Sequence, residues 1–175
     1  MIVLFLVVEC GLMFAVSANF QTLHQAYPYA VTALVSSILA AISQLLNQLL
    51  FVHKFMPART LKFHTWGTVN GIINKYWYDL ITPLFPSIPL RVIIDQCIGT
   101  PVFNVLFLSF SALWENHNIP YTVRTKLRTT LTSAYIIWPL FSFVSFQFIP
   151  QHLIVPAAGI VGILWTLILS KITES

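Results

Sequence analysis

The sequence predicts an all-α integral membrane protein, a helix bundle with four to six membrane-embedded helices. Hydrophobic residues make up 57% of the 175 residues and charged residues only 8%, whereas charged residues are about a quarter of an average soluble domain. Several apolar runs approach or exceed the length of about 20 residues that a helix needs to cross a bilayer. Backbone N–H and C=O groups in lipid must be paired within their own segment, so these runs are predicted to be helices.

The first apolar run, residues 1–18, is predicted to be an N-terminal extension of a single membrane-embedded domain that covers residues 19–175. Val16-Ser17-Ala18 resembles the small-residue cleavage site of a signal peptide. A signal peptide usually begins with positive charge, however, and this chain has no Lys or Arg before Lys54. We therefore favour a retained, shallow or tilted apolar helix over a signal-like segment.

The next predicted helix covers residues 29–52 and is long enough to span. Ala33, Ser37 and Ala41 recur every four residues, which makes a face of small side chains suited to close helix packing. Gln44 and Gln48 continue the same side. Amides within a span need hydrogen-bond partners, so this face is predicted to look inward.

A basic, proline-containing connector over residues 53–64 is expected to lie on the lipid headgroups. The helix after it is predicted over residues 66–84. It opens with Gly67 and Gly71, another signal for close packing. Lys75 and Asp79 are four residues apart, so they can neutralise each other on one face. The adjacent Trp77-Tyr78 pair is typical of an interfacial aromatic anchor.

Three prolines, Pro83, Pro86 and Pro89, predict a stiff turn before a spanning helix over residues 91–114. Pro101 removes a hydrogen bond within this helix and is expected to kink it. The helix also carries three polar residues inside the apolar run, namely Asp95, Gln96 and Asn104.

The last third of the chain begins with a basic segment, residues 121–133, that is predicted to start an amphipathic helix. An apolar stretch follows over residues 134–148. Pro150 and Pro156 are expected to bracket a tight break, and a final helix is predicted to run from Pro156 to the region of Leu169.

The basic residues lie in short gaps between apolar runs, chiefly in residues 53–64 and 121–128. This is the positive-inside pattern, so both gaps are predicted to face the same side of the membrane, with the proline-rich turn opposite. Helices 66–84 and 91–114 then form one hairpin. A nucleic-acid binder would instead gather its charge in a patch, and no nucleic-acid partner is expected.

A set of residues has the identity, order and spacing of a family pattern. It contains Pro28, Gln48, Gly71, Trp77-Tyr78, Asp95-Gln96, Pro101, Trp138-Pro139, Phe146, Pro150, Trp165 and Leu169-Ser170. On this set the sequence resembles the twenty-two-kilodalton peroxisomal membrane protein family, also called the Mpv-seventeen family. The resemblance covers residues 17–171.

The sequence also departs from this family pattern. The family has a Gly-Asp pair, Pro, His, Gln, Asn, Arg and Asn at positions that this chain fills with Ser43-Gln44, Ile72, Lys75, Ser142, Ser145, Ile154 and Thr166. Packing residues remain, so the fold is expected to persist. Several polar groups have become smaller or apolar, which weakens a polar pathway that depends on them.

The resemblance implies a small membrane protein of an organelle, in the mitochondrial inner membrane or peroxisome, with the vacuole as a further alternative. It implies a channel-like function that passes small solutes or tunes membrane permeability. A polar file would line the path, made of Gln44, Gln48, Asp95, Gln96 and Asn104. The expected partners are membrane lipid and, as an alternative to a monomer, further copies of the chain. No cofactor, metal site or catalytic residue is expected.

Two other interpretations stay open. One is a small membrane-embedded enzyme, cyclase-like, in which Asp79 and Asp95 protonate an apolar substrate. The other is a structural helix bundle. Asp95 itself has two readings: an intramembrane acid often marks an ion or substrate pathway, but a partner in Arg91 one turn away, or the positive start of its helix, would make it structural.

Overall fold

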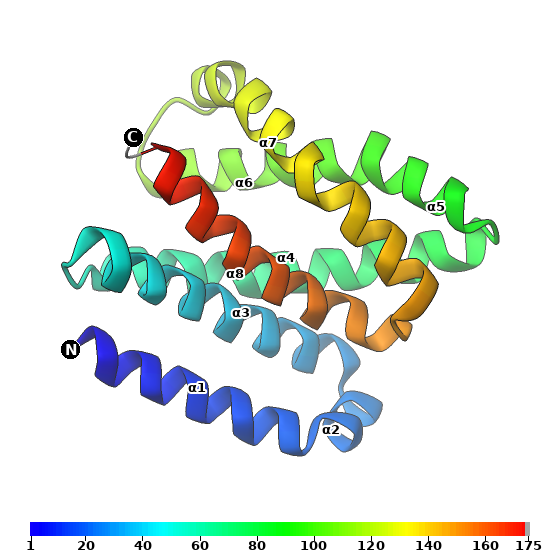
Figure 1. The fold of residues 1–175 in the computed structure, drawn as a ribbon, viewed down its shortest axis with the longest axis horizontal. Coiled ribbons are helices and arrows are strands. Elements are labelled where there is room, and N and C mark those ends of the chain that lie inside the picture. Colours follow the sequence, from blue (N-terminus) through cyan, green and yellow to red (C-terminus); the bar gives the residue numbers. More distant parts are fainter. Residues whose placement is uncertain (174–175) are drawn as a thin grey trace. The chain divides into compact units, whose positions relative to one another are not determined.

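The computed structural model describes residues 1–173 of the chain, with side chains as far as Leu167. The motif side chains of Leu169 and Ser170 lie outside this part. The described residues form helices α1 (Ile2–Ala18), α2 (Phe20–Ala26), α3 (Pro28–Asn47), α4 (Pro57–Leu84), α5 (Ile88–Ile94), α6 (Thr100–Trp114), α7 (Ile119–Phe148) and α8 (Gln151–Thr173), with π-helical segments η1 (Gln48–Val52) and η2 (Asp95–Gly99) (Figure 1). The all-α prediction is confirmed.

Prolines set where many of these helices begin, because the fixed φ of proline suits the first helical turn and its missing N–H costs nothing there. Helices α3 and α4 start at a proline, and α5, α6 and α7 each have one within their first two positions. Helix α4 therefore begins at Pro57, and the predicted connector over residues 53–64 is wrong beyond residue 56. The turn before α5 contains only Pro86, since Pro83 lies inside α4.

One other predicted boundary is also wrong. Residues 121–133 start a helix, as predicted, and it continues through residues 134–148 as α7, which contains Pro139. Pro156 lies inside α8, so only Pro150 falls in the break between these helices. Membrane helices tolerate internal proline when neighbouring groups satisfy the freed carbonyls.

The irregular backbone associated with Pro101 lies in the turn before the proline and not at the proline itself. The backbone N–H of Thr100 bonds the carbonyl of Asp95, which is the wider register of a π-helix. Segment η2 thus absorbs the disturbance just before the proline. The other π-helical segment, η1, begins at Gln48 and ends at His53, whose φ of 54° is left-handed. The two π-helical segments start at Gln48 and Asp95, which are both predicted polar site residues.

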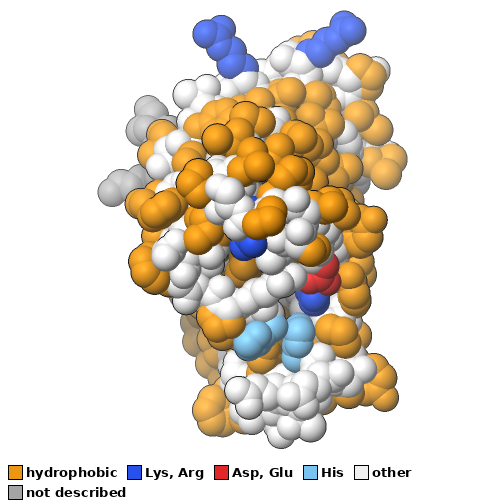
Figure 2. Space-filling model, turned by 90° about the vertical axis from the view of Figure 1, so that its right-hand side faces the viewer, with side chains coloured by type: hydrophobic (Ala, Val, Ile, Leu, Met, Phe, Trp, Pro, Cys, Tyr) orange, Lys and Arg blue, Asp and Glu red, His pale blue; other side chains and the backbone are white. Residues whose placement is uncertain are grey.

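In the described part, three helical stretches are long and apolar enough to cross a membrane: Pro28–Val52, Ile88–Trp114 and Ile119–Phe148. A fourth results if α1 and α2, which are bent by 73°, form one broken span. Many large hydrophobic side chains are exposed, and Figure 2 shows patches of them over much of the visible face, with few charges among them. Such a surface suits lipid rather than water.

The chain divides into two units, residues 76–154 and the remainder on either side, so α4 and α8 each continue from one unit into the other. In the first unit α1 and α2 pack on α3. Its core is formed by Val31, Val35 and Leu39, with partly buried neighbours Met13, Val16, Phe20, Leu23 and Ile163. In the second unit α5 and α6 pack on α7.

The two glycines of α4 are sites of close packing, as the sequence predicted, and the helix that they contact is α3. A Cβ on Gly67 would lie 2.5 Å from the Ser36 carbonyl oxygen, and one on Gly71 would lie 2.6 Å from the Ser36 hydroxyl. Gly67 also approaches Ala40 while Gly71 approaches Thr32, so the two helices run antiparallel. The first part of α4 therefore follows α3 back along its length, although α4 itself is not apolar enough to count as a span.

The α3 surface that the glycines approach is the stripe Thr32, Ser36 and Ala40. Of the predicted set Ala33, Ser37 and Ala41, only Ser37 is among the groups nearest to the glycines. The predicted inward orientation is nevertheless confirmed, because all members of that set are buried.

Candidate functional site

Asp95 is the centre of a hydrogen-bonded cluster in the second unit. It is 5% exposed and occupies the first position of η2. Its Oδ1 atom accepts a hydrogen bond of 2.8 Å from the Trp77 indole N–H. Its Oδ2 atom accepts bonds from the Ser142 hydroxyl and, at 3.1 Å, from the Gln96 amide. Helices α4 and α7 and segment η2 thus meet at one buried carboxylate.

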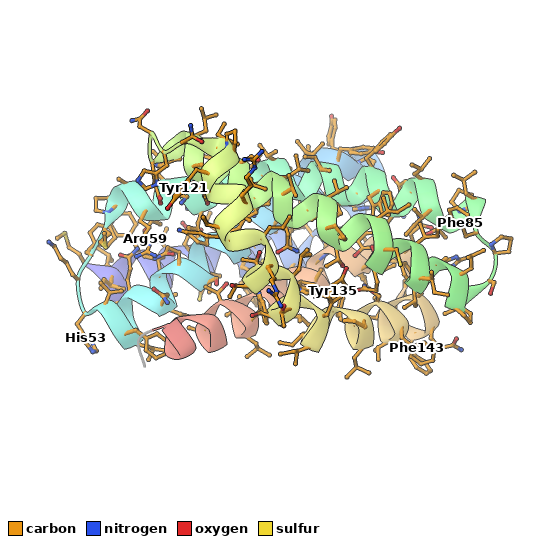
Figure 3. All side chains as sticks on the ribbon, turned by 90° about the horizontal axis from the view of Figure 1, so that it is seen from above. His53, Arg59, Phe85, Tyr121, Tyr135 and Phe143 are labelled. Atoms are coloured by element: carbon orange, nitrogen blue, oxygen red, sulfur yellow. The ribbon has the colours of Figure 1, made fainter. Side chains whose placement is uncertain are left out.

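Gln96 ties the same elements together through its other polar groups. Its Nε2 atom also donates to the Ser142 oxygen at 2.8 Å, and its Oε1 atom accepts from the Thr100 hydroxyl at 3.1 Å. In a π-helix the carbonyl of Gln96 would accept a hydrogen bond from the backbone N–H five residues later. That residue is Pro101, which has no N–H. The phenol of Tyr135 on α7, labelled in Figure 3, donates to this carbonyl at 3.0 Å. The Tyr135 hydroxyl therefore supplies the hydrogen bond that Pro101 cannot donate to this carbonyl.

The cluster needs a glycine at position 99. A Cβ there would lie 2.8 Å from Asp95 Oδ1 and 3.0 Å from the Trp77 indole nitrogen. The absent side chain lets the indole lie across the helix and reach the carboxylate. Trp77 is thus a hydrogen-bond donor to Asp95, and its neighbour Tyr78 is buried, whereas the sequence predicted an interfacial aromatic anchor for both.

Both structural readings of Asp95 offered by the sequence are wrong in their details. Arg91 donates to the carbonyl oxygens of Phe85 and Pro86 instead of pairing with Asp95. Asp95 also lies well inside its helical run, which begins at Ile88, so it is not at a positive helix start. Its partners come from Trp77, Gln96 and Ser142. Asn104 bonds the Thr100 carbonyl of its own helix at 2.8 Å and not the carboxylate.

The two glutamines of α3 differ sharply in their surroundings. Gln48 is fully buried and satisfied: its oxygen accepts from the Met56 backbone N–H at 2.7 Å, and its amide donates to the Thr60 hydroxyl at 3.0 Å. It fixes the turn between α3 and α4. Gln44, one turn earlier, is 1% exposed, and its amide nitrogen has no hydrogen-bond partner. The hydroxyl of the neighbouring Ser43 is buried and unpartnered as well.

A second polar cluster, in the first unit, was not foreseen from the sequence. Glu9 of α1 is 6% exposed, and its Oε1 atom lies 2.9 Å from His64 Nε2. The other ring nitrogen of His64 lies 3.0 Å from the Ser37 hydroxyl. The second carboxylate oxygen of Glu9 is buried and unpartnered. A charged residue in an otherwise apolar run was the signal that could have identified this cluster.

The order Glu9, His64, Ser37 is that of a nucleophilic triad, but the surroundings do not suit acyl transfer. The Ser37 oxygen also lies 3.1 Å from the His64 carbonyl, to which it donates. A Cβ on Gly67 would lie 2.8 Å from the Ser37 Cα, so the helices are in close contact at this serine. A substrate carbonyl has no room there. We interpret the cluster as a structural hydrogen-bond network that joins α1, α3 and α4.

Lys75 and Asp79 both have contacts within the chain. Lys75 lies over the Tyr29 ring, with its amine 5.3 Å from the ring centre. Asp79 accepts a bond of 2.9 Å from Gln151. In the part of the chain that the structure describes, no group of three or more His, Cys, Asp and Glu side chains is arranged to hold a metal ion.

A model of the Mpv17 / PMP22 family matches residues 112–170. "PXMP2/4 family protein 4" of Dictyostelium discoideum is 30% identical to the chain, and the match covers 94% of the chain and 96% of the relative. The chain belongs to the Mpv17 / PMP22 family. "PXMP2/4 family protein 3" of the same organism is 29% identical over 82% of the chain and 83% of its own length. Protein SYM1 of Eremothecium gossypii is 26% identical over 83% and 89%, respectively. No solved structure matches the chain.

Membership of the Mpv17 / PMP22 family confirms the resemblance inferred from the sequence motifs and makes the chain a small membrane protein. Several motif residues meet at the Asp95 cluster, namely Trp77, Asp95, Gln96 and Pro101. Ser142, which departs from the family pattern, still reaches Asp95 directly. The departures at Ser43 and Gln44, by contrast, coincide with the unpartnered groups of α3.

Proposed function

We propose that this member of the Mpv17 / PMP22 family is a channel-like protein that passes small polar solutes across an organelle membrane. The observation that supports the proposal is the pair of buried, unpartnered polar groups on α3, the Ser43 hydroxyl and the Gln44 amide. A buried polar group without a partner costs about 1–3 kcal/mol. A passing solute or water would supply the missing hydrogen bonds.

The proposal narrows the polar file expected from the sequence. Gln44 is its best remaining member, whereas the polar atoms of Gln48 are already engaged within the chain. In the second unit both carboxylate oxygens of Asp95 accept bonds from protein donors. These groups hold helices together and offer little to a solute. For the same reason Asp95 is poorly placed to protonate a substrate, as the enzyme interpretation requires.

Solute flux into proteoliposomes tests the proposal. Gln44→Leu should lower the swelling rate in glycerol or urea without lowering stability, because it removes an amide that has no partner in the chain. Gln48→Leu is the matched control. It should lower stability, because it leaves the partly buried Met56 N–H unbonded. Equal flux in the wild type, Gln44→Leu and protein-free vesicles would refute the proposal.

A structural helix bundle is the second candidate function. The closed Asp95 cluster favours it, since this buried polar network is satisfied by protein groups. On this alternative the orphan amide of Gln44 only destabilises the fold. Gln44→Leu would then raise stability and leave solute flux at the level of protein-free vesicles in every variant.

The organelle is also part of the proposal. The family resemblance suggests the mitochondrial inner membrane or the peroxisome. A relative in Saccharomyces cerevisiae, 25% identical over 62% of this chain and 38% of its own length, is named a vacuolar membrane protein. Fluorescence microscopy of the tagged chain against markers of the three organelles distinguishes these locations.

A further inference from the structure

One ridge of α7 is exposed along most of the helix. Every fourth residue from position 124 to position 144 is exposed, and the series changes from basic through hydroxyl to apolar: Arg124, Arg128, Thr132, Ile136, Leu140 and Val144. We call this series the α7 ridge. Ile136 and Leu140 are 76% and 68% exposed. The buried residues of α7, such as Ala134, Phe141 and Ser145, belong to other faces.

The basic end of the ridge carries charge that the chain does not neutralise. Arg124, Arg128 and the neighbouring Lys126 are exposed, and none of the described residues forms a hydrogen bond or ion pair with their side chains. The sequence has no Asp or Glu between Asn118 and Phe148. The two arginines lie one turn apart on the same ridge, and guanidinium groups bind phosphate oxygens in a bidentate manner.

The length of α7 places this charge at headgroup depth. The stretch from Arg128 to Phe148 is about 30 Å long at the rise of an α-helix, which equals the hydrocarbon thickness of a bilayer. With Phe148 at one boundary, Arg128 lies at the other.

We propose that the α7 ridge binds a glycerophospholipid with an anionic headgroup. The phosphate lies between Arg124 and Arg128, and one acyl chain follows the ridge past Ile136 and Leu140. A zwitterionic lipid fits less well, because its headgroup cation would meet three uncompensated positive charges. A free phosphate ion fits less well too, because it leaves the apolar half of the ridge unused. This inference is independent of the proposed solute flux.

The test measures the thermal stability of the purified protein in detergent as lipid is added. Dioleoyl phosphatidylglycerol should raise the unfolding temperature, whereas dioleoyl phosphatidylcholine and sn-glycerol 3-phosphate should not. Each Arg→Gln change on the ridge should weaken the apparent affinity for phosphatidylglycerol about fivefold, and the double variant about 25-fold, since a basic residue near an anionic surface contributes about a factor of five. Raised salt should weaken binding in the wild type.

The matched control is the double variant Lys54→Gln with Arg59→Gln. It removes the same number of exposed positive charges from the first unit and should bind phosphatidylglycerol like the wild type. Three results would overturn the proposal: equal stabilisation by both lipids, equal stabilisation by glycerol 3-phosphate alone, or equal losses in the ridge and control variants. The substituted side chains are exposed, so the variants are expected to fold.

Discussion

Replacing Asp95 with asparagine tests the cluster that holds the second unit together. The carboxylate accepts from Trp77, Gln96 and Ser142, all of which are donors in the wild type. In Asp95→Asn the oxygen can keep the indole bond, and the new amide can donate to the serine oxygen. The Gln96 amide then faces another donor and loses its bond to residue 95.

One unmade bond at a buried site costs about 1–3 kcal/mol, and lost charge assistance in the remaining bonds adds to this. We therefore expect Asp95→Asn to lower the free energy of unfolding by about 2–4 kcal/mol. Asp79→Asn is the matched control. Asp79 is less buried than Asp95, and its bond from Gln151 lies at an exposed site, so its change should cost less than that of Asp95.

Unfolding by SDS titration in mixed micelles measures these energies, and a double-mutant cycle assigns the partner. Asp95→Asn and Trp77→Phe should couple by about 0.5–3 kcal/mol, because each change removes the same indole–carboxylate bond. Asp95→Asn and Arg91→Gln should add independently. Coupling to Arg91 without coupling to Trp77 would refute the reasoning.

Three further predictions concern packing and topology. Gly67→Leu should destabilise by at least about 1–3 kcal/mol in the same titration, whereas Gly11→Leu, with open space around its Cβ, should stay near the wild type; equal values would mean that α3 and α4 are not in close contact. Gly99→Ala should push the indole off Asp95, lowering stability and shifting tryptophan fluorescence; an unchanged spectrum would contradict the geometry. In a chain whose native cysteines are replaced by serine, Ala58→Cys and Thr125→Cys should be labelled from the same side, because both lie in the basic regions that the positive-inside pattern places on one side; labelling from opposite sides would contradict this topology.

The sequence was sufficient for the class of fold and the approximate position of the long helices, although α2 was not predicted. Apolar length and the demand for paired backbone groups dictate both, and Gly67 and Gly71 were correctly read as packing sites. Helix boundaries were less predictable. Pro57 starts a helix while Pro156 lies within one, and the local sequence does not distinguish these settings.

The partners of the polar residues could not be predicted, because they come from distant parts of the chain. The free-energy cost of a carboxylate in an apolar run identified Asp95 as a residue that needs a partner. The partner Ser142 lies 47 positions away, and the nearer Arg91, which the sequence suggested, bonds backbone carbonyls instead. Glu9 and His64 are 55 positions apart and were not connected at all. Burial cost identifies the residue that needs a partner, whereas only the packing of helices identifies the partner.

Recordings from planar bilayers test the proposed channel-like function most directly. The purified wild-type protein is incorporated, and current is measured in symmetric salt, beside Gln44→Leu and a protein-free control. The proposal predicts discrete conductance steps in the wild type and smaller or rarer steps in Gln44→Leu. Silent bilayers with folded wild-type protein, or identical steps in both proteins, would contradict the assignment of Gln44 to a solute path.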